Sequence, residues 1–208
     1  MRLILVRHAE STSNVRHILD ATSPGPELTA RGLDQAVQLP AALAAFDVDA
    51  VYASSLTRAQ QTAAPFAASI GLPVIVRDGL REISAGSLEL RGDDESMRAY
   101  FATVDAWHAG DLARRMPGGD DGAEVLARFD AVVAEIVGLG VPVVLVVSHG
   151  AMIRFWVAAR TDEGPAALVA AEMLENTGVI ELDGDTGAGW SVRSWIPSAV
   201  AQPGSPGL

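Results

Sequence analysis

The sequence predicts an α/β protein, a single domain with a mainly parallel central sheet and helices on both faces. Two short apolar runs, at Leu3–Val6 and Val143–Val147, have the composition of strands that are buried on both sides. Segments with helical periodicity separate the predicted strands, so strands and helices alternate along the chain. This alternation is typical of parallel sheets whose crossover connections are helices. A chain of 208 residues is long enough to bury one sizeable core.

The first half of the chain is predicted to hold three strands and two helices. Leu3–Val6 is the first strand, and Thr29 caps a helix that runs to about Ala45. The apolar positions of this helix are Leu33, Ala36, Val37, Leu39 and Leu43. Pro40 lies inside it and predicts a kink or a break. The elements that follow are a strand at Ala50–Ala53, a helix at Leu56–Ile70 and a strand at Pro73–Arg77.

The second half opens on a polar, Gly-rich stretch, Leu80–Asp94, which is predicted to be a loop. The later elements are helices at about Ser96–Ala109 and Gly122–Leu139, the strand Val143–Val147, a helix at Ala151–Arg160, and a hairpin of strands Val179–Leu182 and Ser191–Trp195. Because no repeat or linker interrupts the chain, residues 1–197 are predicted to form one domain. Residues 198–208 contain Pro, Gly and Ser without periodicity and are predicted to be a disordered tail.

Composition excludes several classes of function. The net charge is −11 and the sequence pI is about 4.7, so an acidic surface is expected to repel nucleic acid and anionic membranes. The chain has no cysteine, which excludes disulfides, thiolate catalysis and cysteine–zinc sites. No stretch reaches the roughly 20 apolar residues of a spanning helix, and the N-terminus lacks a signal-peptide pattern. We therefore expect a cytoplasmic protein.

Two of the predicted strands end in a histidine. Leu3–Val6 is followed at once by Arg7 and His8, and Val143–Val147 is followed by Ser148, His149 and Gly150. In open α/β sheets, ligands bind at the carboxyl ends of the strands. An arginine beside an imidazole at such an end combines an anion-binding fork with a nucleophile or base. The repetition predicts one site that is built from both ends of the chain.

At these residues the sequence resembles the histidine phosphatase superfamily, in the phosphoglycerate mutase-like branch that also includes related small phosphatases. The matching segments are LVRHAESTSN at 5–14, LTARGLDQA at 28–36, YASSLTRAQQTA at 52–63, LREISAGSLE at 80–89, MPGGDDGAEVLARF at 116–129 and VVLVVSHGAMIR at 143–154. Ala9 departs from the glycine that the family has more often, and Ser87 to Leu90 depart from its usual bulkier aromatic followed by Glu-Gly. The second departure concerns the substrate entrance rather than the reaction.

The resemblance implies phosphoryl transfer through a phosphohistidine. His8 would be the nucleophile, and Glu82 the general acid in the first step and the general base in the second. Arg7 and Arg58 would hold the phosphoryl oxygens, and His149 would bind the phosphate and stabilise the transition state. Gly150 would permit close backbone approach. Further hydrogen bonds to the substrate are expected from Asn14, Ser11 and Thr12.

The resulting hypothesis is a metal-independent phosphomonoester hydrolase of the histidine acid phosphatase type, with no cofactor and a small phosphorylated metabolite as its substrate. The first alternative is a phosphoglycerate mutase-type isomerase, and the second is a phosphate-binding or regulatory protein with little catalysis. Known mutases resemble one another in a longer chain with a Gly-Leu-Asn-Lys segment, whereas this region here reads AGSLELRGDDES at 85–96. A homodimer is one option for the oligomeric state.

A two-histidine, one-carboxylate metal site at His8, His149 and Glu82 is the competing interpretation of the same residues. The cations Arg7 and Arg58 argue against it, because they would repel a metal ion. Specificity is expected to come from the loop at Ser84–Glu95 and the helix at Ser96–Ala109, with Arg91 affecting substrate preference. The remaining histidines and the tryptophans are expected to have surface and packing roles. They are His17, His108, Trp107, Trp156, Trp190 and Trp195.

Overall fold

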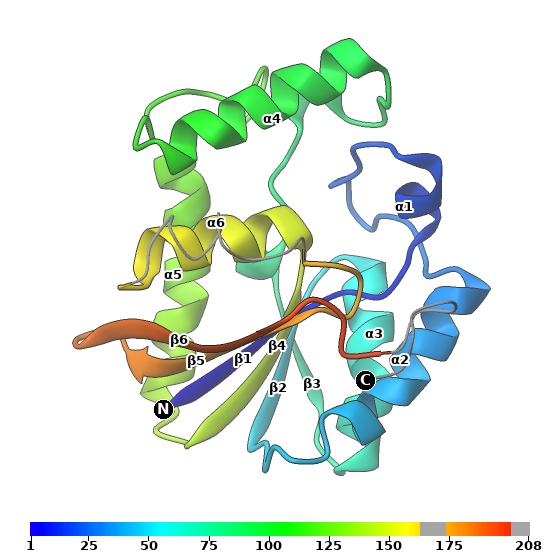
Figure 1. Ribbon diagram of the computed structural model, residues 1–208, viewed down its shortest axis with the longest axis vertical. Helices are drawn as coiled ribbons and strands as arrows, with labels where there is room; N and C mark the ends of the chain where they lie inside the picture. Colours follow the sequence, from blue (N-terminus) through cyan, green and yellow to red (C-terminus); the bar gives the residue numbers. More distant parts are fainter. Residues whose placement is uncertain (163–173, 201–208) are drawn as a thin grey trace.

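The computed structural model describes residues 1–162 and 174–200 and contains one six-stranded sheet (Figure 1). The strand order across the sheet is β3-β2-β4-β1-β5-β6. The strands are β1 (Arg2–Arg7), β2 (Ala50–Ser54), β3 (Val74–Arg77), β4 (Val143–Ser148), β5 (Val179–Asp185) and β6 (Gly189–Ile196). The pairs β3–β2, β2–β4 and β4–β1 are parallel, and β5 and β6 add an antiparallel hairpin at one edge. The predicted mainly parallel α/β fold is therefore confirmed.

The helices connect the strands and cover both faces of the sheet (Figure 1). They are α1 (Thr12–Arg16), α2 (Ala30–Ala42), α3 (Thr57–Ser69), α4 (Asp94–His108), α5 (Gly122–Gly138) and α6 (Gly150–Arg160). Two short 3₁₀ turns, η1 (Asp78–Leu80) and η2 (Gly86–Leu88), lie in or beside the stretch predicted to be a loop. Among the described residues, no helix is long and apolar enough to cross a membrane.

Side-chain alternation along β1 divides the core into two layers. Leu3 and Leu5 point to the face that α5 and α6 cover, whereas Ile4 and Val6 point to the face that α2 and α3 cover. All four side chains are fully buried. A strand that is buried on both faces needs no polar alternation, which is why this segment is an unbroken apolar run.

Helix α2 differs in detail from its prediction. The Thr29 hydroxyl caps it as expected, accepting a hydrogen bond from the Gly32 amide at 3.0 Å. The buried side of α2 includes Ala36 and Leu39. Leu33 and Val37 lie on another side of the helix and are exposed. The helix continues through Pro40 but ends at Ala42 rather than Ala45. Pro40 lacks the N–H group that would bond the carbonyl four residues earlier, and the helix ends two residues after it.

The last described residues are tied to the core. The Ala199 amide donates to the Thr177 carbonyl at 3.1 Å, and the Val200 side chain is buried beside β1 and β4. The described fold therefore extends three residues beyond the expected domain boundary at residue 197. The rest of the predicted tail, residues 201–208, lies outside the described residues.

We expect Gly32→Ala to destabilise the fold, because a Cβ atom at this position would collide with the carbonyl group of Glu10. Inserting atoms into packed backbone costs about 1–3 kcal/mol. Gly138→Ala is the matched control: this glycine is also helical, and its Cβ would meet nothing within 4 Å. That variant should gain about 0.5–1 kcal/mol. Urea unfolding measures both free energies, and equal values for the two variants would contradict the prediction.

Candidate active site

The two strand-end histidines lie side by side because of the register between β1 and β4. Arg7 pairs with Ser148 across the parallel ladder, so the residues that follow both strands leave the sheet at the same level. The His8 amide donates to the Ser148 carbonyl at 2.9 Å and continues this pairing beyond the strands. The rings of His8 and His149 are 5.1 Å apart between centroids, at an interplanar angle of 60°. The predicted single site from both ends of the chain is therefore formed.

Hydrogen bonds define one tautomer of His8. Its Nδ1 lies 2.7 Å from the Ala9 carbonyl oxygen, which can only accept, so Nδ1 carries the proton. The Arg58 Nε–H group lies 3.1 Å from His8 Nε2, which must therefore accept through its lone pair. The neutral imidazole consequently directs an unprotonated Nε2 toward the arginine. This is the protonation state that a nitrogen nucleophile requires.

The surroundings of His8 keep it neutral. Burial lowers the pKa of His8 well below 6.5, and the positive charges of Arg58 and Arg7 lower it further. The hydrogen bond to Ala9 acts in the opposite direction and is the weaker influence. His149 is also fully buried, and its pKa is lowered for the same reasons, burial first and Arg58 next.

Buried nitrogen atoms without partners gather around His8. The Arg7 guanidinium donates to the Leu174 carbonyl at 2.6 Å, and Arg58 donates to the Asp20 carbonyl at 3.0 Å. In the described part of the chain, Arg7 Nε, Arg58 Nη1 and His149 Nδ1 have no hydrogen-bond partner although all three are buried. An unpaired buried polar group is costly, and such groups are expected where a ligand will satisfy them. Two of the three are cationic, so the missing partner is an anion.

The His149 ring is fully buried beside that of His8 and is held by Ser54. Its Nε2 lies 2.8 Å from the Ser54 hydroxyl at the end of β2. Ser148, the residue before it, donates its hydroxyl to the Leu80 carbonyl at 2.8 Å. Ser148 is thus occupied as an anchor between β4 and the segment that leads to Glu82.

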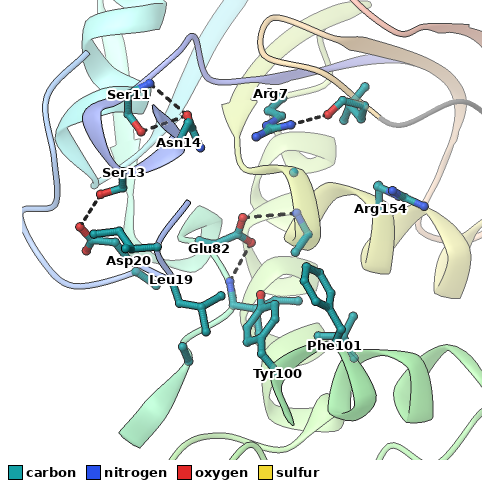
Figure 2. A pocket seen from close by; sticks show the side chains of 18 of the residues that line it. Arg7, Ser11, Ser13, Asn14, Leu19, Asp20, Glu82, Tyr100, Phe101 and Arg154 are labelled. Carbon is teal, nitrogen blue, oxygen red and sulfur yellow. Dashed lines mark hydrogen bonds between the residues drawn. The ribbon is translucent and has the colours of Figure 1, made fainter. Parts of the chain in front are cut away.

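Glu82 faces the amino end of α6. Its Oε1 accepts hydrogen bonds from the amides of Ile83 and Met152, both at 2.9 Å. Its Oε2 is 3.3 Å from the Ala151 amide, so this second oxygen is the less engaged of the two (Figure 2). Arg128 of α5 holds the segment in place by donating to the carbonyls of Gly79, Arg81 and Glu82 at 2.7–3.0 Å. The sequence did not reveal the role of Arg128, because its partners are backbone carbonyls of a segment at least 46 residues away.

These residues surround a cavity of about 630 Å³ at the carboxyl end of the sheet. Of the predicted site residues, those that line it are Arg7, His8, Ser11, Asn14, Arg58, Glu82 and Gly150. Figure 2 shows Ser11 and Asn14 on one side, Arg7 and Arg154 on the other, and Tyr100 and Phe101 on the α4 side. Glu82 lies between these groups, so the charged residues converge on one space.

Two predicted site residues, Thr12 and His149, do not line the cavity, and Arg91 has the position of a solvated loop arginine. Thr12 is exposed at the start of helix α1 and is not part of the cavity lining. His149 is covered and does not line the cavity itself. Arg91 lies outside the lining and forms an exposed ion pair with Asp93 at 2.9 Å. Gly150 does permit a close approach: a Cβ there would lie 3.1 Å from Arg7 Nε.

Asn176 is a further site residue that sequence reasoning missed. Its Nδ2 group donates to the His8 carbonyl at 2.9 Å and to Asn14 Oδ1 at 3.2 Å. Asn14 Oδ1 also accepts from the amide and the hydroxyl of Ser11, both at 3.0 Å, which leaves the Asn14 amide nitrogen as its donor. No periodicity marks Asn176, because it lies in a turn before β5 and acts across 168 residues.

Arg154 and His108 also line the cavity. Their positions could have been found from helical spacing, since His108 is four and eight residues from Val104 and Tyr100 on the same face of α4. The expectation that His17 and His108 are ordinary surface or interface histidines is therefore too narrow, because both line the cavity. Trp107, Trp156 and Trp190 are buried, as predicted for packing residues.

The donor set does not fit a metal ion. Within residues 1–162 and 174–200, no group of three His, Asp or Glu side chains is arranged to hold one. His8 Nε2 and His149 Nε2 are engaged by Arg58 and Ser54, and Arg58 and Arg7 add two positive charges. Cations at this position favour an anionic ligand instead.

Comparison with known proteins agrees with the geometry of the site. The family model described as histidine phosphatase superfamily (branch 1) matches residues 3–196, and the chain belongs to this superfamily. The adenosylcobalamin/alpha-ribazole phosphatase of Escherichia coli is 32% identical over 162 residues, which cover 76% of this chain and 78% of that protein. Proteins named as probable phosphoglycerate mutases are also among the relatives.

Two mycobacterial proteins are similar over nearly the whole chain. A PE-PGRS family protein of Mycobacterium tuberculosis is 32% identical over 206 residues, which are 91% of this chain but only 35% of that protein. The solved structure of a mycobacterial glucosyl-3-phosphoglycerate phosphatase with VO3 has a TM-score of 0.77 and 26% identity, covering 94% of this chain and 98% of that one. Its fold is the phosphoglycerate mutase-like fold predicted for this chain.

We expect stability to fall as the pH decreases from 7.5 to 5. The buried His8 and His149 have lowered pKa values in the folded state, whereas in the unfolded chain they titrate near pH 6.5. Below pH 6.5 the unfolded state therefore binds more protons, and acid favours unfolding until the folded pKa values are reached. Melting temperatures across this range should fall less steeply in His149→Asn than in the wild type.

His17→Gln is the control for this pH dependence, because the His17 side chain is exposed. Its melting temperature should follow the wild-type slope. Equal slopes for the wild type and His149→Asn would show that the buried pair does not contribute to acid sensitivity.

Proposed function

We propose that this protein is a phosphatase that hydrolyses a small phosphomonoester through a phosphohistidine on His8. The observation that carries the proposal is the set of buried, unpartnered nitrogens of Arg7, Arg58 and His149 around the unprotonated Nε2 of His8. A dianionic phosphoryl group would satisfy these donors and bring phosphorus to the nucleophile. The relatives that are named as phosphatases support the same class of reaction.

In the first step, the lone pair of His8 Nε2 attacks phosphorus while the bond from phosphorus to the ester oxygen breaks. Arg58 must turn its Nε–H group from His8 to a phosphoryl oxygen as the substrate enters. The electron pair of the broken bond stays on the ester oxygen, which takes the proton that Glu82 carries on Oε2. The alcohol leaves, and the phosphoryl group remains on His8.

In the second step, water attacks the phosphohistidine from the side that the alcohol has left. Glu82, now ionised, takes a proton from this water as the bond between phosphorus and Nε2 breaks. Inorganic phosphate forms, and the electron pair returns to His8 as its lone pair. Glu82 is protonated again, so each atom and proton is restored for the next turnover.

The surrounding residues stabilise the negative charge on the oxygens of the transferred phosphoryl group. Arg7 and Arg58 provide donors to the equatorial oxygens of phosphorus, and Gly150 leaves room for the Arg7 side chain. The unpartnered Nδ1 of His149, whose ring lies 5.1 Å from that of His8, is the third donor. The Asn14 amide nitrogen and Ser11, both in the cavity lining, contribute at the entrance.

Hydrolysis is favoured over mutase activity because the cavity is accessible to water. Phe101 lines it and is 48% exposed, so the cavity reaches the surface at this residue. A mutase has to keep water from its phosphorylated histidine until the phosphoryl group is returned to the substrate. The segment that covers the site in this chain is short and contains no lysine. Isomerisation of 3-phosphoglycerate is the activity that would favour the mutase alternative.

The test of this function is phosphate release from a panel of small phosphomonoesters, with a chelator present and 3-phosphoglycerate assayed separately for isomerisation. Chelator-resistant release is expected. Complete loss of activity with the chelator would contradict the metal-free reaction, and isomerisation without release would identify a mutase.

The variant His8→Ala lacks the proposed nucleophile. Its rate of phosphate release should be lower by several orders of magnitude, because removing one member of a catalytic unit costs most of the rate enhancement. Phosphohistidine is labile in acid, so the intermediate has to be trapped under alkaline conditions. The protein is mixed with a ³²P-labelled substrate and then denatured in alkali. The wild type should retain label and His8→Ala should not. Equal labelling of both proteins would place the intermediate elsewhere.

Asn176 is expected to be a positioning residue. Asn176→Leu keeps the approximate size of the side chain and removes the Nδ2 donor to the His8 carbonyl without adding a charge. We expect kcat to fall by about 10²-fold with KM within a fewfold of the wild type, because small displacements of the reacting groups are costly. An unchanged kcat, or a rise in KM alone, would assign Asn176 to substrate binding or to no role in the reaction.

A further inference from the structure

The cavity extends well beyond the space that a phosphoryl group needs. Its volume of about 630 Å³ lies in the middle of the range of about 300–1,000 Å³ that is typical of sites for drug-sized ligands. The reactive groups Arg7, His8 and Arg58 occupy only the end next to the sheet. The remaining volume is therefore available to the alcohol that leaves.

Helix α4 forms one wall of this outer space. Met97, Tyr100, Phe101 and Val104 line the cavity, and their spacing of three and four residues places them on one face of the helix. Tyr100 and Val104 are buried, whereas Phe101 remains 48% exposed and its ring lies edge-on to Tyr100, with centroids 5.4 Å apart. Phe101 thus presents an aromatic surface to whatever enters (Figure 2).

A second apolar part of the lining comes from the segment after α1. Ile18 and Leu19 line the cavity from the segment after α1. The Leu19 amide donates to the Arg91 carbonyl at 2.9 Å, and the Leu90 amide donates to the Leu19 carbonyl at 2.7 Å. This pairing ties the segment to the loop before α4.

The charges in the outer space do not favour a second anion. Arg154 lines the cavity, but Asp105 of α4 lies near it, and burial lowers the pKa of Arg154 against the opposing effect of Asp105. Two more carboxylates, Asp20 and Glu175, belong to the lining. The cations that are positioned for an anion belong to the phosphoryl end, where Arg7 and Arg58 have unpartnered nitrogens.

We propose that this outer space is a leaving-group subsite for an alcohol that bears an uncharged ring with an apolar face, and that Phe101 is its specificity-determining residue. The ring would lie between Phe101 and Leu19, with its polar edge toward Arg154 and His108. A short ester that carries a carboxylate would make few contacts with the apolar lining. Its charge would also be repelled by Asp105, Asp20 and Glu175. This inference rests on the proposed phosphatase function and goes beyond it by naming the class of alcohol.

Three phosphate esters of primary alcohols test this proposal, because their leaving oxygens are alike. Adenosine 5′-monophosphate carries a ring base, ribose 5-phosphate lacks the base, and 3-phosphoglycerate is short and carries a carboxylate. In the wild type we expect kcat/KM to be about tenfold or more higher for the nucleotide than for ribose 5-phosphate, as expected for stacking of a base on an aromatic side chain. It should be lower still for 3-phosphoglycerate.

In Phe101→Ala the preference for the nucleotide should fall to about threefold or less, while kcat/KM for ribose 5-phosphate stays within about twofold of the wild type. The constant rate on ribose 5-phosphate shows that the variant is folded and that its phosphoryl end is intact. Val37→Ala is the matched control, since it removes another exposed apolar side chain, 68% exposed on α2 and outside the cavity. It should keep the wild-type preference.

The outcomes separate this inference from the function on which it rests. Hydrolysis of ribose 5-phosphate or 3-phosphoglycerate at the same kcat/KM as the nucleotide would overturn the subsite and leave the phosphatase intact. An unchanged preference in Phe101→Ala would overturn the role of Phe101. No release from these esters or from p-nitrophenyl phosphate would overturn both proposals.

Discussion

The parallel register between β1 and β4 is the constraint on which the rest of the site depends. Arg7 pairs with Ser148, and the next residue of each strand is a histidine. A slip of one residue would turn Leu3, Leu5 and their neighbours to the wrong face of the sheet, so the buried core on both sides holds the register in place. The catalytic arrangement is thus stabilised by hydrophobic packing that has no part in the chemistry. Ser148 and Ser54, at the ends of β4 and β2, extend this order to Glu82 and His149.

The same burial that makes the fold stable gives the site its electrostatic character. His8 is neutral because it is buried beside Arg58 and Arg7, and these cations remain incompletely paired within the described chain. Such an arrangement costs stability in the free protein, and binding of an anion restores the missing partners. Backbone carbonyls at Leu174 and Asp20 orient the guanidinium groups without neutralising them. The positive charge is therefore preserved for the ligand.

The proposed reaction and the proposed specificity belong to different parts of the structure. The sheet and the amino end of α6 hold the reactive groups, whereas α4 and the segment after α1 form the outer walls of the cavity. Proteins named for different phosphorylated substrates resemble this chain, and a shared fold does not fix the substrate. Phe101 and Leu19 belong to the outer part. Their changes would alter which alcohol is accommodated without moving His8.

Local pattern was sufficient for the strands, most of the helices and the residues that follow the strand ends. Apolar runs mark buried strands, and the motifs around His8, Arg58, Glu82 and His149 lie in contiguous segments that can be compared directly. Contacts between distant segments leave no such pattern. Asn176 reaches His8 across 168 residues, and Arg128 binds three carbonyls that any sequence could provide. Likewise, only packing decides that Thr12 is exposed and absent from the cavity lining, because burial depends on the neighbours that the tertiary fold supplies.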